Sequence, residues 1–347
     1  MASAAALVDD LVAEILLHLP PHDPSGLVRA SLACKSWRRL LTDPAFLRRY
    51  REFHREPPLL GFFHNVYAIP CFIPTTMASP WSERAFGSSG WRALDCRHGR
   101  VLLDGMDEKN LLVWDPITGD RQLLHAPDIR RSSVSFCAAV MCTAGGCDHL
   151  NCHSGPFMVV FLGSEVGITQ ACVYSSEGDA WSVPASVHHD IRIGLFQYRG
   201  VLIGDDVFFN LSRNTILKYD LGTDSLSMID SPAVDDHYVL VCGKRIIGHR
   251  KHQGFQPLPM QTVLISYAEK AETIFVSTDV VTFMINLKSG RAKKLDEPWS
   301  YYNALPFVSF YTPDFCKWPI TLARGGTLLS PSVAVPGADF TNPSSCA

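Results

Sequence analysis

The chain has 347 residues, a length that predicts about two domains. Hydrophobic residues make up 47% of it and charged residues only 19%, so most of the chain can bury a core and is not expected to be disordered. The formal net charge of -3 argues against a general nucleic-acid binder and against attachment to an anionic membrane. No run of about 18 apolar residues occurs, so no segment is expected to span a bilayer.

The cysteines and the amino terminus favour a reducing compartment. The 11 cysteines are an odd number scattered from Cys34 to Cys346, which fits free thiols better than a disulfide framework. The apolar stretch at residues 1–8 is too short for the hydrophobic region of a signal peptide, and Asp9 and Asp10 follow it directly. We therefore expect the protein in the cytosol, the nucleus or both.

Residues 1–56 have the apolar periodicity of helices. A first amphipathic helix that ends before Pro20 is predicted by apolar residues at four-residue steps: Leu7, Leu11, Ile15 and Leu19. A second apolar set runs from Leu27 to Leu41, and Asp43-Pro44 is typical of the start of a third helix. Three short helices bury too little surface to be strongly stable alone, so we expect a partner to cover the remaining apolar face.

The order of residues over about positions 7–50 resembles the F-box. The resemblance is carried by Leu7-x-Asp9-Asp10-Leu11-x-x-Glu14-Ile15-Leu16-x-x-Leu19-Pro20 and by Leu27-x-x-Ala30-Ser31-Leu32-Ala33-Cys34-Lys35-x-Trp37-Arg38-x-Leu40. F-box modules dock on the Skp adaptor of SCF-type cullin ubiquitin ligases. The resemblance implies that the adaptor-binding positions are Leu7, Ile15, Leu16, Leu19, Leu27, Leu32, Cys34, Lys35, Trp37 and Leu40.

Two positions depart from the F-box pattern. Val8 stands where the family usually has proline, and Ala33 replaces a larger aliphatic residue. Each change removes little apolar contact, so we expect docking to survive both. A helical cap that only packs on the rest of the chain is the alternative interpretation of the same periodicity.

From residue 57 onward, short apolar segments alternate with Gly, Asp, Ser and Pro turns, which predicts all-β structure. An apolar strand end, a polar turn and a new strand recur at Leu112–Gly119, Cys172–Asp179, Leu217–Asp224 and, more weakly, Met284–Gly290. A hairpin that returns about every 45 to 65 residues is typical of four-stranded propeller blades. The uneven steps require insertions or a degenerate blade.

The phrases Trp114-Asp115-Pro116-x-Thr118-Gly119 and Ile274–Asp279 resemble the associated domain of plant F-box proteins, especially those of the large grass families. That resemblance implies a kelch-like β-propeller. The expected fold class is therefore α+β multidomain, with a helical F-box at 1–56, a β-propeller-like domain at 57–323 and a poorly ordered tail at 324–347. Residues 232–266 lack the tryptophan that the resembled family usually has in a blade core here, so a blade is expected to be eroded or replaced by a loop, and closure of the ring stays open.

The sharpest cluster of metal-ligand residue types is Cys142-x4-Cys147-x-His149-x2-Cys152-His153. Three thiolates with an imidazole from His149 or His153 would make a full tetrahedral set for zinc. Structural zinc sites favour other spacings, so we expect a Gly-rich loop with neither metal nor cofactor and keep zinc as the alternative.

The other polar clusters predict no active site. His188-His189-Asp190 and Asp235-Asp236-His237 place imidazole beside carboxylate, but adjacent strand residues point to opposite faces. Asp104-x2-Asp107-Glu108-Lys109 is interpreted as a charged turn without EF-hand spacing, and the basic residues from His249 to His252 as an exposed loop. The P-loop, nucleophile-elbow, dinucleotide and His-Glu-x-x-His motifs are absent from the sequence.

The hypothesis that fits these observations is a non-catalytic adaptor. Its F-box would bind the Skp adaptor and through it the cullin and RING subunits, and its β domain would hold a target protein, with neither nucleic acid nor membrane as partner. The target-binding residues are unknown, although loops on one propeller face are expected to carry them. Two alternatives stay open: a propeller-type enzyme or carbohydrate- or metal-binding protein with a helical head, and an interaction scaffold outside the ligase.

Overall fold

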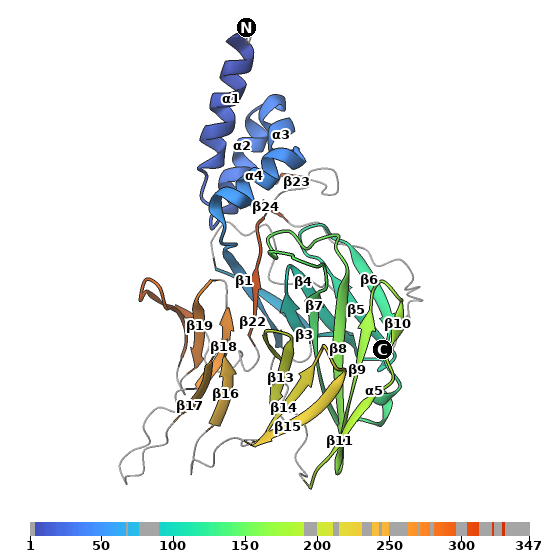
Figure 1. Ribbon diagram of the computed structural model, residues 1–347. Coiled ribbons are helices and arrows are strands. Elements are labelled where there is room, and N and C mark those ends of the chain that lie inside the picture. Colours follow the sequence, from blue (N-terminus) through green and yellow to red (C-terminus); the bar gives the residue numbers. More distant parts are fainter. Residues whose placement is uncertain are drawn as a thin grey trace, which may run out of the picture.

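The computed structural model describes residues 4–66, 69–75, 90–190, 200–210, 215–230, 238–242, 245–249, 263–268, 271–277, 281–295, 304–311, 321–322 and 328–329. The first helices gather at one end of the molecule, and the β-sheets lie beyond them (Figure 1). None of the described helices is both long and apolar enough to cross a membrane.

The helical part consists of α1 (Ala4–Leu17), α2 (Pro24–Ala33), α3 (Lys35–Thr42) and α4 (Pro44–His54). Asp23 and Asp43 begin α2 and α4, because each side chain accepts a backbone N–H of the first turn and a proline follows directly. The apolar set from Leu27 to Leu41, expected as one helix, is two helices. Cys34 interrupts it with an extended backbone, and its Sγ caps α3 by accepting the N–H of Trp37 at 3.5 Å.

The core of this module joins α1 to α4. Leu16, Leu17 and Tyr50 are among its buried side chains. The Tyr50 hydroxyl donates to the carbonyl oxygen of Leu19 at 2.7 Å, and a ring nitrogen of His54 bonds the carbonyl oxygen of Leu17 at 3.0 Å. The second bond satisfies a carbonyl group of the last residue of α1, which has no partner inside its own helix, and the first fixes the turn that follows α1.

The remaining described elements are antiparallel sheets. One sheet has the order β2 (Ile69–Pro74), β1 (Leu59–Val66), β22 (Leu305–Val308). The next runs β3 (Trp91–Arg97), β4 (Arg100–Gly105), β5 (Asn110–Trp114), β6 (Arg121–His125), and is followed by α5 (Ile129–Ser132). The third contains β7 (Ser135–Cys142), β8 (Phe157–Glu165), β9 (Ile168–Ser175) and β10 (Ala180–Trp181), with β11 (Ala185–His188) also paired to β9.

Two further four-stranded sheets follow: β12 (Val201–Ile203), β13 (Asp206–Asn210), β14 (Thr215–Asp220), β15 (Ser225–Asp230), and β18 (Val263–Ala268), β19 (Thr273–Ser277), β20 (Thr282–Asn286), β21 (Ala292–Leu295). Two strand pairs complete the described part, β16 (Tyr238–Cys242) with β17 (Arg245–His249) and β23 (Thr321–Leu322) with β24 (Leu328–Leu329). Apart from Leu328–Leu329, the expected tail from residue 324 lies outside the described residues.

The sheets follow one another around a closed ring. Strand β22 contacts β3, β3 contacts β7, β11 contacts β15, β13 contacts β16, β16 contacts β18, and β18 returns to β22. Strand β22 comes from the end of the β region and pairs with β1 at its beginning, so chain ends far apart in sequence share one sheet. The expected β-propeller is therefore confirmed, with five blades of three or more described strands. Within residues 232–266, where a blade was expected to be eroded, the structure describes the pair β16–β17 between two complete blades, and residues 250–262 lie outside the described residues.

The recurring sequence motif has the same position in four blades. It ends the third strand and forms the turn to the fourth strand. Asp115 and Asp220 each accept the backbone N–H groups two and three residues further on. The distances are 2.8 and 3.1 Å for Asp115, and 3.0 Å for both bonds of Asp220. Asn286 and Ser175 accept the N–H three residues further on at 2.8 and 3.4 Å. The short polar side chain therefore stabilises the turn, as is typical of Asx and Ser turns.

A second position of these turns has left-handed backbone. Four residues after the short polar side chain, and five after the strand residue that precedes it, φ is 77°, 48°, 49° and 66° at Gly119, Asp179, Asp224 and Gly290. Where aspartate stands there, the strand residue is a tyrosine whose hydroxyl donates to it: Tyr174 to Asp179 at 2.5 Å and Tyr219 to Asp224 at 3.2 Å. The uneven steps between turns arise because residues 143–156 lengthen the connection of β7 to β8, and β16–β17 lengthens the last step.

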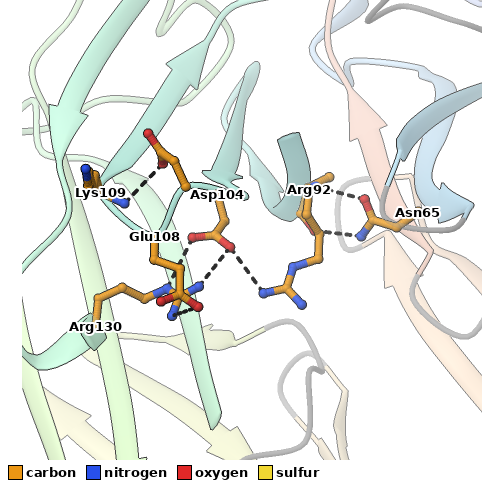
Figure 2. Close-up of polar contacts among 8 residues, drawn as sticks. Asn65, Arg92, Asp104, Glu108, Lys109 and Arg130 are labelled. Atoms are coloured by element: carbon orange, nitrogen blue, oxygen red, sulfur yellow. Dashed lines mark hydrogen bonds and ion pairs between the residues drawn. The ribbon is translucent and has the colours of Figure 1, made fainter. Parts of the chain in front are cut away.

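Polar groups join neighbouring blades. Asn65 of β1 exchanges two hydrogen bonds with the backbone of Ala93 in β3, at 2.8 and 2.9 Å (Figure 2). Asp95, fully buried in β3, accepts the backbone N–H of Val140 in β7 at 2.9 Å. These bonds link β1 to β3 and β3 to β7, in addition to the apolar contacts between the sheets.

The propeller also contributes to the helical core. Phe310, which follows β22, has no exposed surface and lies among the core residues of the helical module. Its ring contacts Tyr50 edge-on with centroids 6.1 Å apart. Leu150, from the connection between β7 and β8, packs against the same core. The helices are therefore held on the propeller by two of its segments.

Candidate functional site

The described positions of the expected adaptor-binding set differ in exposure. Leu16 and Leu27 are each 2% exposed and belong to the helical core, against which Leu19, Trp37 and Leu40 also pack. Ile15, Leu32, Cys34 and Lys35 are exposed. The side chain of Leu7 lies outside the described residues. The set therefore combines residues that build the module with residues that are open to a partner.

In helix α1, neighbouring residues differ in whether they build the core or are open to a partner. Ile15 is 66% exposed while its neighbour Leu16 is 2% exposed, because successive helical side chains point about 100° apart. Leu11, one turn before Ile15 on the same face, is 64% exposed, and sequence reasoning did not include it among the site residues. Its four-residue spacing to Ile15 was the signal that could have added it.

A second exposed group lies where α2 meets α3. Leu32 is 46% exposed near the end of α2, and Cys34 and Lys35 are exposed at the start of α3. Trp37 is half-buried, with part of its ring against the helical core. A side chain that is fixed by a core yet partly open is suited to anchor a partner, because little conformational entropy is lost on binding.

The cysteine cluster forms a compact group at the end of β7 and in the connection to β8. One ligand atom from each of Cys142, Cys147, His149 and Cys152 can be chosen so that all lie within 4.8 Å of one another. His153 is directed elsewhere, and its Nδ1 bonds Asp115 Oδ2 at 2.6 Å. Of the two histidines left open by the sequence, the fold therefore brings His149 to the three sulfurs.

The buried charges near the turn after β4 differ from the expectation of a charged turn. Asp104 lies within β4 and is 1% exposed, whereas Glu108 and Lys109 are exposed. Asp104 pairs with Arg92 at 3.2 Å and Arg130 at 3.4 Å, and Arg130 also reaches Glu108 at 3.6 Å (Figure 2). Burial raises the pKa of Asp104, and the two guanidinium groups oppose that rise.

This arrangement favours a structural role for Asp104. Its carboxylate oxygens already face two arginines, and Arg130 lies over the ring of Phe136 with 3.8 Å between its Cζ and the ring centroid. Arg130 belongs to α5, so the pair holds that helix against β4. A carboxylate neutralised in this way is a poor general acid or base, which weighs against the propeller-enzyme alternative at this position.

The histidine–aspartate phrases give no catalytic pair among the described residues. His189 is buried and its Nε2 bonds Thr169 Oγ1 at 2.9 Å, while His188 and Asp190 are exposed. The expected opposite orientation of the adjacent histidines is confirmed. Asp235-Asp236-His237 and residues 250–252 lie outside the described residues, whereas His249, expected in an exposed loop, is the last residue of strand β17 and pairs with Tyr238 of β16.

Family comparisons match both parts of the chain. The model for the F-box domain matches residues 6–49. The model described as F-box protein AT5G49610-like, beta-propeller matches residues 92–245. No curated protein matches the chain.

Solved structures share only a distant likeness. A structural genomics protein of unknown function from Bacteroides thetaiotaomicron is 12% identical over 60% of this chain and 44% of that one, with a TM-score of 0.31. The nidogen/laminin complex matches at 10% identity over 70% and 80%, with a TM-score of 0.33. Glutaminyl cyclase from Myxococcus xanthus matches at 12% identity over 68% and 88%, with a TM-score of 0.34. The chain spans less than half of the first protein, and scores this low carry no functional argument.

Proposed function

Because the chain belongs to the F-box proteins that carry a β-propeller, we propose that it is the substrate-recognition subunit of an SCF-type cullin–RING ubiquitin ligase. F-box domains generally bind Skp adaptors, and the adaptor would connect this chain to the cullin and RING subunits. The chain would act without catalysis of its own. It would raise the effective concentration of a target protein near the ubiquitin donor.

The observation that carries the proposal is the exposed apolar face of α1. Leu11 and Ile15 are both more than 60% exposed one helical turn apart, beside a well-packed core. Burial of one such side chain contributes about 1.5 to 3 kcal/mol, so a partner that covers both gains substantial binding energy. Helices that present anchors at this spacing are a recurrent mode of protein recognition.

The propeller is the part that we assign to the target. Its strands are largely occupied in packing, whereas its turns lie at the surface of a rigid ring, where binding residues are usually found. The chemistry of the target and the residues that contact it stay open. We also propose the cytosol or the nucleus as its location, which is where a ligase of this class would meet a Skp adaptor.

The direct test measures binding of a Skp-type adaptor to the full chain and to the variant Ile15→Asp. We expect the variant to bind about 30-fold more weakly, the effect of losing a hot-spot contact of about 2 kcal/mol. Leu123→Asp is the matched control, because Leu123 is 60% exposed on β6 of the propeller and lies outside the proposed interface. The measurement is biolayer interferometry with circular dichroism to show that both variants are folded.

Equal affinity of the wild type and Ile15→Asp would contradict the proposed interface. Ile15 is a better probe than Leu16, since a charge at the buried Leu16 would unfold the helices and remove binding for a different reason. The folded Ile15→Asp variant would also retain an intact propeller. Expressed in cells, it should hold the target without promoting its ubiquitination, so the target should accumulate in the purified complex.

A further inference from the structure

The connection between β7 and β8 brings together four side chains that bind soft divalent metals. Cys142 ends β7, and Cys147, His149 and Cys152 lie in residues 143–156, before β8 begins. Three cysteine sulfurs and one imidazole nitrogen form a complete tetrahedral donor set, and zinc is the metal that such sets typically hold. Ordered loops of this length without helix or strand are uncommon and are usually stabilised or used in some way.

The spacing of the donor atoms agrees with a shared metal. Tetrahedral bond lengths to zinc place two sulfurs about 3.8 Å apart and a sulfur and a nitrogen about 3.6 Å apart. The Sγ atoms of Cys147 and Cys152 are 3.5 Å apart, and Cys152 Sγ is 3.4 Å from His149 Nδ1. The sulfurs are also well beyond the bond length of a disulfide, which is about 2.05 Å.

The backbone is shaped to bring these atoms together. His149 has a φ of 59° and Gly146 has a φ of 66°, so two left-handed residues fold a short stretch back on itself. The backbone N–H of His149 donates to Cys147 Sγ at 3.4 Å, a contact that stabilises sulfur as a thiolate. Left-handed backbone at a non-glycine residue costs free energy, which metal binding would offset.

A neighbouring histidine supports the group from outside. The ring of His98 lies flat on that of His149, with centroids 3.9 Å apart and planes 6° apart. His98 Nδ1 also accepts the backbone N–H of Cys142 at 3.0 Å. One side chain thus orients two members of the cluster, which is how second-layer residues position metal ligands in proteins.

We propose that Cys142, Cys147, His149 and Cys152 bind one zinc ion as a closed structural site. All four positions would be filled by the protein, so the site holds the loop and performs no catalysis. The unusual spacing of the ligands in sequence does not oppose this assignment, because the left-handed turns at Gly146 and His149 bring them within reach.

The loop that would hold the zinc contacts both the helical module and the propeller. Leu150, inside the metal-binding stretch, packs against the helical core. On the other side, His153 bonds Asp115, and Arg100 donates to the carbonyl oxygen of Gly155 at 2.6 Å. Zinc would therefore stabilise a loop of the propeller that also packs against the F-box.

The test begins with the full chain purified under reducing conditions from zinc-supplemented cells. Elemental analysis by mass spectrometry should find about one zinc per chain, and this should fall to near zero in Cys147→Ser and in Cys152→Ser. His153→Gln is the matched control, because His153 adjoins Cys152 in sequence but bonds Asp115. It should retain the metal.

A second measurement keeps the proposal falsifiable if the cysteine variants fail to fold. Cobalt(II) titrated into chelator-stripped wild-type protein should give the charge-transfer and d–d bands of a tetrahedral thiolate site, and zinc should remove them. Hydrogen exchange in α4 should rise when the wild type loses its metal. Wild-type protein without stoichiometric zinc, a stoichiometric metal other than zinc, or a Cys147–Cys152 disulfide in the reduced preparation would each overturn the assignment.

Discussion

The helical module and the propeller use apolar residues in opposite ways. In α1, Leu11 and Ile15 are more than 60% exposed although they sit beside a packed core. In β4, Val101, Leu102 and Leu103 are consecutive and have no exposed surface, because both faces of the blade are covered. The low charged fraction of the chain follows from the second pattern, since strands buried on both faces need few polar residues.

This difference indicates which part is complete without a partner. The propeller buries its apolar strands inside its own ring and closes that ring with β22. The F-box leaves an apolar face uncovered and borrows Phe310 and Leu150 from the propeller for its core. The F-box therefore packs against the propeller on one side and leaves an apolar face exposed on the other. Such a module is suited to join its own propeller to a second protein.

The largest effect should come from the interior of the propeller. Phe161 on β8 has no exposed surface, so Phe161→Ala should destabilise the fold by about 3 to 5 kcal/mol. Leu123→Ala on β6, where the side chain is 60% exposed, should change stability by less than about 0.5 kcal/mol. Urea unfolding followed by tryptophan fluorescence measures both. Similar losses in the two variants would show that the blades are not covered as described.

The next prediction concerns the contact between the helical module and the propeller. Phe310→Ala removes a fully buried ring that the propeller places against Tyr50, at an expected cost of about 3 kcal/mol. Hydrogen exchange should rise in α4 and stay nearly unchanged in β7 and β8. Phe53→Ala provides the comparison, since Phe53 lies in α4 but is 47% exposed. If exchange rises equally throughout the chain, the two parts unfold as one unit.

A smaller effect concerns the repeated turn of the blades. Gly119 has a φ of 77° and its side-chain position faces open space, so Gly119→Ala should cost about 1 kcal/mol through backbone strain alone. Gly178→Ala, in the corresponding turn of the next blade, introduces a Cβ in ordinary contact and has no left-handed φ. It should leave the melting temperature nearly unchanged or raise it. Calorimetry that finds the reverse order would contradict the assigned turn geometry.

The smallest effect is a pH dependence confined to the F-box. Burial lowers the pKa of His54, so the folded state binds fewer protons than the unfolded state just below the ordinary histidine range. Stability should therefore decrease as the pH falls from the unfolded pKa of about 6.5 toward the lower folded pKa. His54→Gln should reduce this dependence in helix-specific hydrogen exchange. An unchanged pH profile in the variant would assign the dependence to another group.

Features that depend on a few neighbouring residues could be predicted from the sequence. Asp43-Pro44 predicts a helix start because a side-chain cap and a fixed proline φ act within one turn. The repeated turns after Trp114, Tyr174 and Tyr219 could be predicted for the same reason, since the short polar side chain bonds its own backbone.

Other features were decided by contacts between distant segments. Ile15 and Leu16 are equally apolar in the sequence, and only the position of α4 and Phe310 decides that one is open and the other buried. In the sequence, His149 and His153 are equal candidates for the imidazole ligand beside the cysteines. In the fold, Asp115 of another blade bonds His153, so His149 is the one near the sulfurs. The amino-acid sequence by itself determined the two-part architecture through local periodicity and turn chemistry. The tertiary structure alone decided which apolar face stays exposed and which imidazole meets the sulfurs, because burial and long-range contacts exist only in the folded chain.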